Sequence, residues 1–169
     1  MPSPIGHALG SIAAGWAAGG RRPYPGWTRQ AVAYGLLGMT PDLDLVVGTH
    51  SGETHSLGAA VIVTLAVWGA GAALRLRPRG ATLSAVFAAY TAHIVLDWLG
   101  EDTSHPFGVM ALWPVSREYF MSPFAVMPAI TRRYWLPGFW SHNFHALIFE
   151  LAVLVPIGVL VFWMARRED

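Results

Sequence analysis

Histidine and aspartate residues occur along the chain at spacings that suit a metal site. His93 and Asp97 are four residues apart, so on a helix they lie on one face and can bind one cation together. Asp42 and Asp44 follow Pro41, which favours a turn from which both carboxylates offer oxygens. Mixed imidazole and carboxylate ligands favour zinc, with manganese or iron as alternatives. Thiolate ligands are excluded because the chain contains no cysteine.

The segment HSGETH adds two imidazoles to this set. His50 and His55 lie on either side of Gly52, in a loop that can fold back toward the carboxylates. Each residue alone has an ordinary alternative role: a buried histidine is more often a hydrogen-bonded core residue, and a single aspartate is more often a helix cap or turn residue. The pair His93 and Asp97 could equally form an intramembrane hydrogen bond. The convergence of the whole set favours a metal site.

Three further polar residues are candidates for substrate binding, namely His105, Arg117 and His142. Arg117 is of the type that pairs with a lipid headgroup or a carboxylate. His142 and His145 are three residues apart and could instead simply begin a helix at the membrane interface.

The composition indicates a membrane protein. Hydrophobic residues make up 54% of the 169 residues and charged residues only 12%, about half of the charged share of a soluble domain. The 11 basic and 10 acidic residues give a net charge of +1 and no broad basic surface, so nucleic acid is not an expected partner. The length suits a single transmembrane domain over residues 1–169, which would carry the metal site.

Long apolar stretches predict an all-α, polytopic helical bundle with about five transmembrane helices. The expected spans are 4–20, 30–48, 57–74, 81–99 and 146–165. Residues 101–141 differ, because five prolines interrupt them and several Trp and Tyr residues are scattered among them. Proline prevents one long helix and these aromatic residues suit the headgroup region, so we expect this segment to be an interfacial cap over one end of the bundle.

The arginines predict how the bundle is oriented. With five spans, three clusters fall on one side: Arg21, Arg22 and Arg29; Arg75, Arg77 and Arg79; Arg166 and Arg167. By the positive-inside rule that side is cytoplasmic, although Arg117, Arg132 and Arg133 fall on the other side. Every histidine then lies at or near the non-cytoplasmic end. We therefore expect a multi-pass protein of the inner (cytoplasmic) membrane whose site faces the non-cytoplasmic side.

These residues, taken in order, resemble the YdjM-like family of LexA-regulated, membrane-bound, metal-dependent hydrolases. The resemblance covers about two thirds of the chain and rests on five elements: His7, PDLD at 41–44, HSGETHS at 50–56, HIVLD at 93–97 and GVMALWPVS at 108–116. The family pattern usually has Arg directly after the first His of HSGETHS, and here Ser51 occupies that position.

The family in turn looks like a distant relative of the all-helical zinc phospholipase C and nuclease group. That resemblance implies a cluster of zinc ions beside a phosphodiester, with two ions expected here. The implied ligands are His7, one of Asp42 and Asp44, His55, His93 and Asp97, and His50 is a further candidate from the residue pattern. The group's HxxxE element is not reproduced, because Glu150 is eight residues after His142 and five after His145. A third ion is therefore not expected.

The expected function is hydrolysis of a phosphoester in a lipid or lipid-linked substrate at the outer leaflet. Two metals would polarise the phosphoryl oxygen and lower the pKa of a bound water, with Asp42 or Asp44 as the catalytic base. One alternative is a non-enzymatic metal-binding or haem-binding membrane protein. Another is a metal transporter, which would need polar residues through the midplane and the cytoplasmic half.

Overall fold

The computed structural model describes residues 1–22, 25–46, 50–103 and 105–166, and over these residues the chain is all-helical. The elements are α1 (Pro4–Gly19), α2 (Gly26–Met39), the 3-10 helices η1 (Pro41–Val46) and η2 (Glu53–His55), α3 (Leu57–Ala73), α4 (Gly80–Leu99) and α5 (Phe139–Met164). The described residues form isolated β-bridges but no strand. The predicted all-α class is therefore confirmed.

Serine caps set where two of these helices begin. The Ser3 side chain accepts a hydrogen bond from the Gly6 amide, and Pro4 follows at the first helical position, where its missing amide is no loss. The Ser56 side chain caps α3 in the same way by accepting from the Ala59 amide. These caps fix the registers of α1 and α3, the helices that begin next to the predicted metal ligands.

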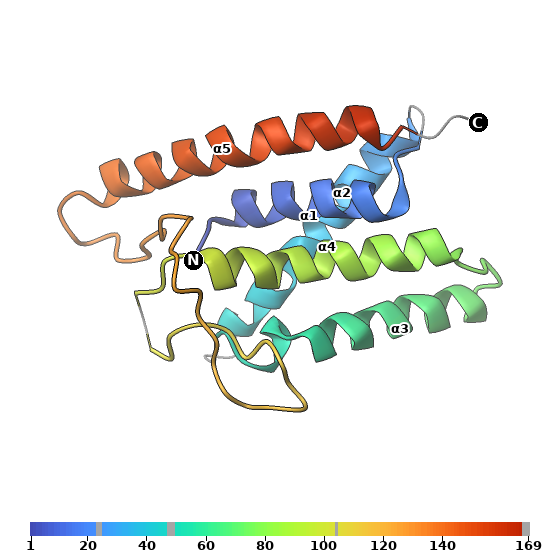
Figure 1. Cartoon of the computed structure of the whole chain (residues 1–169), viewed down its shortest axis with the longest axis horizontal. Coiled ribbons are helices and arrows are strands. Elements are labelled where there is room, and N and C mark those ends of the chain that lie inside the picture. Colours follow the sequence, from blue (N-terminus) through green and yellow to red (C-terminus); the bar gives the residue numbers. More distant parts are fainter. Residues whose placement is uncertain (23–24, 47–49, 104, 167–169) are drawn as a thin grey trace.

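Helix α1 lies at the centre of the bundle. It packs against α2, α4 and α5, whereas α3 lies at the edge and packs on α4 (Figure 1). Small residues allow the close approach: a Cβ on Gly19 would lie 2.5 Å from the Cβ of Ala85, and one on Gly15 would lie 2.5 Å from the Tyr34 ring. A core of Trp16, Tyr34, Ala85 and Ala89 fills this junction.

Successive helices run in opposite directions, which separates the bundle into two ends. The α1–α2 turn, the α3–α4 loop and the end of α5 lie at one end (Figure 1). At this end the Arg21 amide donates a hydrogen bond to the Ala165 carbonyl over 2.6 Å, which joins the α1–α2 turn to the end of α5. The three predicted arginine clusters therefore share one end, except that Arg167 lies outside the described residues.

The Pro-rich segment covers the opposite end, as predicted for a cap, and it is irregular from Glu101 to Gly138 in its described part. It binds the helix ends through backbone hydrogen bonds. The Leu57 and Gly58 amides at the start of α3 donate to the Ala111 and Trp113 carbonyls, and the Val126 amide donates to the Leu99 carbonyl at the end of α4. Backbone groups that a helix end leaves unpaired are thus satisfied by the cap.

Two of the described helices, α4 and α5, are long and apolar enough to cross a membrane. Helix α3 is apolar but has 17 residues, and α1 and α2 have 16 and 14. The predicted five-span bundle is therefore not confirmed by helix length. The predicted span at 30–48 divides into α2 and η1, because Thr40 and Pro41 end the α-helical hydrogen bonding, and its last two residues lie outside the described part.

Candidate metal centre

Four side chains from three elements converge under the cap. Asp42 comes from η1, His55 from η2, and His93 and Asp97 from the last turns of α4. One donor atom from each residue lies within 4.8 Å of the others, so these four residues, called the quartet below, could hold a metal ion. The α4 pair meets as its spacing predicts, with His93 Nε2 lying 3.0 Å from Asp97 Oδ2.

Four donor-to-donor distances within the quartet lie near those of a tetrahedral zinc shell. Bonds of about 2.0–2.1 Å to a tetrahedral zinc would place ligand atoms about 3.3–3.4 Å apart. His55 Nε2 lies 3.4 Å from Asp97 Oδ2 and 3.6 Å from Asp42 Oδ1. His93 Nε2 lies 3.7 Å from Asp42 Oδ1 and 3.0 Å from Asp97 Oδ2. The spacings fall on both sides of the tetrahedral value.

Several of these donor atoms are buried and have no hydrogen-bond partner. They are His55 Nε2, His93 Nε2 and both carboxylate oxygens of Asp97. Buried polar atoms are almost always paired, because an unpaired one costs free energy that the fold must recover elsewhere. A cation bound within the quartet would satisfy His55 Nε2, His93 Nε2 and Asp97 Oδ2 together, so the donor set fits a metal ion.

The outer nitrogens of the two quartet histidines are held by neighbouring groups. His93 Nδ1 lies 2.6 Å from the Gly38 carbonyl oxygen, which can only accept, so Nδ1 carries the proton and Nε2 keeps its lone pair. His55 Nδ1 lies 3.2 Å from Asp44 Oδ2 and 3.0 Å from Thr54 Oγ1. Such partners fix the ring orientation and the tautomer of metal-binding histidines.

Asp44 therefore has a different position from Asp42. Its carboxylate contacts the far nitrogen of His55, accepts from Thr54 Oγ1 over 2.9 Å and lies 2.9 Å from His50 Nδ1. Burial disfavours its charge, but the imidazoles of His55 and His50 outweigh burial and lower the pKa of Asp44 to about 2. Asp44, His50 and His55 form a second group that could hold a metal ion.

The charges around His55 also favour a cation. Burial disfavours a charged imidazole, yet the carboxylates of Asp42 and Asp44 outweigh it and raise the pKa of His55 to about 9. Burial likewise opposes the charge of Asp42, but the nearby imidazole of His55 lowers the pKa of that carboxyl. A positive charge is thus stabilised at the centre of the site, where a metal ion can replace the proton.

His7 approaches the quartet from α1. Its Nε2 lies 3.2 Å from Asp97 Oδ1, the oxygen that faces away from His55, and its ring stacks on His93 with centroids 3.8 Å apart. His7 is buried, with 1% of its surface exposed. The structure thus brings together all seven predicted metal residues: His7, Asp42, Asp44, His50, His55, His93 and Asp97.

The three predicted substrate-binding residues lie outside this cluster and are exposed. The His105 ring lies against Phe107 in the cap, with centroids 4.0 Å apart. His142 begins α5, and its Nε2 contacts the Ala129 carbonyl oxygen over 2.8 Å. Arg117 lies in the cap next to Glu118, and its role stays a prediction.

Sequence reasoning missed two residues that support the site. Gly38 holds His93 through its carbonyl, which no side-chain pattern can indicate. Glu150 is fully buried on α5 and accepts hydrogen bonds from Ser3, at the start of the helix that carries His7. Its signal was a lone carboxylate in an apolar stretch, which in a membrane helix indicates a buried partner.

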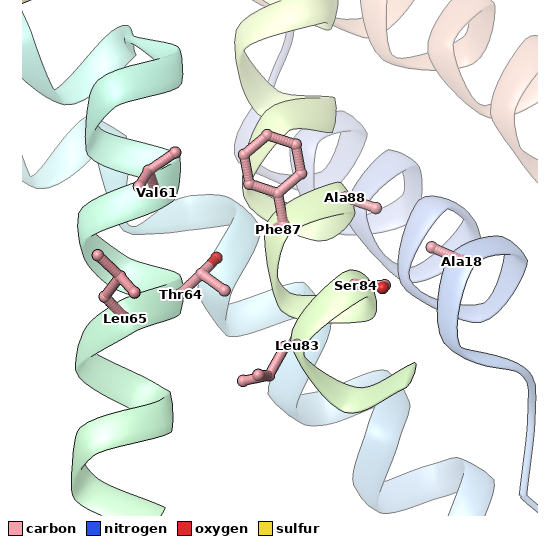
Figure 2. Close-up of a pocket in the computed structure, with 8 residues that line it drawn as sticks. All are labelled: Ala18, Val61, Thr64, Leu65, Leu83, Ser84, Phe87 and Ala88. Atoms are coloured by element: carbon pink, nitrogen blue, oxygen red, sulfur yellow. The ribbon is translucent and has the colours of Figure 1, made fainter. Parts of the chain in front are cut away.

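An apolar groove of about 490 Å³ lies away from the metal donors, between α1, α3 and α4. Figure 2 shows Thr64 on α3 directed toward α4, and Ala18 on α1 facing Ala88 on α4. The residues that line the groove include no histidine and no carboxylate. It therefore belongs to the apolar flank of the bundle and is not the metal site.

One comparison with known proteins identifies a relationship. The model of the family described as YdjM inner membrane protein matches residues 1–168, which is nearly the whole chain. No curated protein and no solved structure matches.

Proposed function

The chain belongs to the YdjM inner membrane protein family, and we propose that it is a membrane-bound, metal-dependent hydrolase that cleaves a phosphoester in a lipid or lipid-linked substrate. One observation carries the proposal: four donors from η1, η2 and α4 converge at tetrahedral spacing, and three of the four residues contribute buried atoms without a hydrogen-bond partner. This arrangement supports zinc, with manganese or iron as alternatives.

Each residue of the cluster would have its own role. The quartet would hold one ion, and His7 Nε2 with Asp97 Oδ1 would hold a second. Asp44 would orient His55, as the Gly38 carbonyl orients His93. When bound, the two ions would polarise the phosphoryl oxygen and lower the pKa of a water molecule.

The second ion matters because the quartet supplies four protein donors. Four donors complete a tetrahedral shell, which is typical of structural zinc, whereas catalytic zinc keeps a position open. The position beside His7 has fewer protein donors and would leave room for substrate. The same count favours a second candidate function, non-catalytic metal binding, if only the quartet binds an ion.

Access to the site supports an amphiphilic substrate. The Asp42 side chain is 23% exposed, whereas the other quartet side chains are fully buried, so a phosphoryl group would approach beside Asp42. The substrate would then lie beside the two aspartates proposed as ligand and catalytic base, Asp42 and Asp44. Two apolar residues of η1 close to Asp42 in the sequence are exposed: Leu43 is 64% exposed and Val46 is 87% exposed. His105, Arg117 and His142 remain candidates for contacts with the headgroup.

We propose further that all five helices cross the membrane, with the arginine end in the cytoplasm and the metal centre at the non-cytoplasmic face. Helix α1 is about 24 Å long and α2 about 21 Å at 1.5 Å per residue, which is less than the roughly 30 Å of a hydrocarbon core. A local thinning of the bilayer would make up the difference. The metal centre would then lie close to the headgroups.

The test is a panel of phospholipids and polyprenyl phosphates incubated with the purified protein in detergent, with zinc or manganese added. Released phosphate or headgroup is measured. We expect turnover with at least one lipid, and Asp97→Asn should abolish it because Asp97 contributes to both ions. A protein that binds one equivalent of metal and turns over none of the lipids would be a non-catalytic metal binder.

A further inference from the structure

Glu150 is a buried carboxylate in the apolar interior of the bundle. It lies on α5 between Ala146 and Leu154, and these three residues form the buried stripe of that helix. Its side chain is 0% exposed. A carboxylate in a membrane-spanning helix is costly unless it has partners, so what it contacts indicates why it is there.

Its partners lie at the start of α1. Glu150 Oε1 accepts from the Ser3 amide over 2.6 Å, and Oε2 accepts from the Ser3 hydroxyl. The Ser3 hydroxyl oxygen in turn accepts from the Gly6 amide over 3.1 Å, which completes the cap of α1. A Cβ on Gly6 would lie 2.7 Å from Glu150 Oε2, so a larger residue at position 6 would force this carboxylate to shift.

We propose that Glu150 is a positioning residue for the metal centre: from α5 it fixes the first turn of α1 and thereby holds His7 against Asp97. This inference rests on the proposed metal site. His7 directly follows Gly6, and its amide donates to the Ser3 carbonyl over 3.0 Å, so Ser3 is joined to Glu150 on one side and to His7 on the other.

Two physical reasons support this role. The first amides of a helix have no partner within it and carry partial positive charge, so a carboxylate beside them is stabilising. Metal binding also tolerates little displacement, because ligand distances vary by only about 0.2 Å. A small shift of the first turn of α1 would therefore be enough to move His7 Nε2 out of range of an ion shared with Asp97.

The experiment measures metal binding by the purified full-length protein in detergent. Zinc affinity is measured by titration calorimetry, and the coordination geometry by the absorption spectrum of the cobalt-substituted protein. The variants are Glu150→Ala, Glu150→Gln, Ser3→Ala and, as the reference for a lost ligand, His7→Ala. A matched control is Phe162→Ala, which weakens the same α1–α5 interface at its far end, where the Phe162 ring lies 5.4 Å from that of Trp16.

Glu150→Ala should lower the affinity for the weaker-bound ion by roughly 10–100-fold and should reproduce the cobalt spectrum of His7→Ala. Glu150→Gln keeps an oxygen for the Ser3 amide and should recover most of the affinity. Ser3→Ala should have a smaller effect in the same direction. Phe162→Ala should lower the unfolding temperature while both affinities stay within about twofold of the unmodified protein.

Three results would overturn the inference. Glu150→Ala could bind both ions normally, or it could resemble Phe162→Ala and lose only thermal stability. Alternatively, His7→Ala could itself leave metal binding unchanged, which would also remove His7 from the proposed function. If Glu150→Ala does not fold, Glu150→Gln and Ser3→Ala decide the question, because both retain part of the hydrogen bonding at the start of α1.

Discussion

Asp42 and Asp44 are two residues apart on η1, yet they face different sides of the same imidazole. Asp42 approaches Nε2 of His55, the nitrogen directed into the quartet, and Asp44 approaches Nδ1, the nitrogen directed away from it. A 3-10 helix has about three residues per turn, so the side chains of residues two apart point in directions that differ by roughly 120°. Asp42 and Asp44 can therefore contact the two different nitrogens of His55. This geometry supports the proposed roles, ligand for Asp42 and orientation of His55 for Asp44, between which the sequence PDLD did not decide.

The two carboxylates should therefore respond differently to substitution. We expect Asp42→Ala to remove most of the metal, because a ligand is lost, and Asp44→Asn to weaken metal affinity by roughly 10–100-fold while the site still forms. Metal content by elemental analysis and affinity by calorimetry measure the two effects. Glu53→Gln is the matched control, since Glu53 is an exposed acid on the same 3-10 turn as His55. Equal losses in both aspartate variants would contradict the assignment.

Metal affinity should also depend on pH in a defined direction. Without metal the pKa of His55 is about 9, so near neutral pH its imidazole carries a proton that a metal ion must displace. Each pH unit below 9 should then lower the apparent affinity about tenfold, and this dependence should disappear above pH 9. Calorimetry in buffers of different ionisation enthalpy counts the released proton. An affinity that stays constant from pH 6 to pH 8 would contradict this prediction.

At the level of elements, the site depends on how closely α1 and α2 approach each other. A Cβ on Gly38 would lie 2.0 Å from Ser11 Oγ and 3.0 Å from the His7 carbonyl oxygen. Gly38→Ala should therefore push α2 away from α1 and move the carbonyl that holds His93. We expect a loss of roughly 1–3 kcal/mol in stability and a weaker metal affinity.

Gly69→Ala provides the comparison, because nothing lies within 4 Å of a Cβ built at Gly69 on α3. An alanine in an open helical position should be neutral or stabilise by about 0.5–1 kcal/mol. Thermal unfolding and metal titration of both variants check the difference. Similar behaviour of the two alanine variants would mean that α1 and α2 do not depend on this contact.

Most helix bounds could be predicted from the sequence, but whether each helix is long enough to cross a membrane could not. The apolar runs predicted the ends of α3 and α4 to within one residue. Small or polar residues mark these ends in the sequence: Ser56 precedes α3, Gly80 begins α4 and Gly100 follows it. The last apolar run begins at Ala146, whereas α5 begins at Phe139, because the first turns of α5 carry the polar residues His142 and His145. The predicted span at 30–48 also continued past Pro41, whereas α2 ends at Met39 and a 3-10 helix follows. Hydropathy alone does not show where the hydrogen bonding changes from α-helical to 3-10.

The donor set of the site was predictable, whereas its geometry was not. Seven histidine and aspartate residues gather as the sequence suggested, because alternating helices bring 7, 42–55 and 93–97 to one end. The different positions of Asp42 and Asp44 around His55 arise on the 3-10 helix η1, and the hydrogen bond between Ser3 and Glu150 joins residues 147 positions apart. No local pattern carries such information.

At the scale of the whole molecule, the two ends of the bundle differ in chemistry and should face different compartments. The chain lacks cysteine, so single cysteines report each end without background. A cysteine at Val115, which is 92% exposed in the cap, should react with an impermeant maleimide in spheroplasts. A cysteine at Gly80, at the start of α4, should react only after the membrane is permeabilised. The reverse pattern would place the metal centre in the cytoplasm.

The origin of the quartet donors has a consequence for how the protein is made. Its ligands lie between residues 42 and 97, on η1, η2 and α4. Synthesis begins at the N-terminus, so a growing chain has no complete ligand set until α4 has emerged and packed on α1. Helix α5, with its tie to Ser3, is made last. The residues of the proposed quartet are therefore all synthesised before α5, which packs mainly on α1 rather than on the quartet elements.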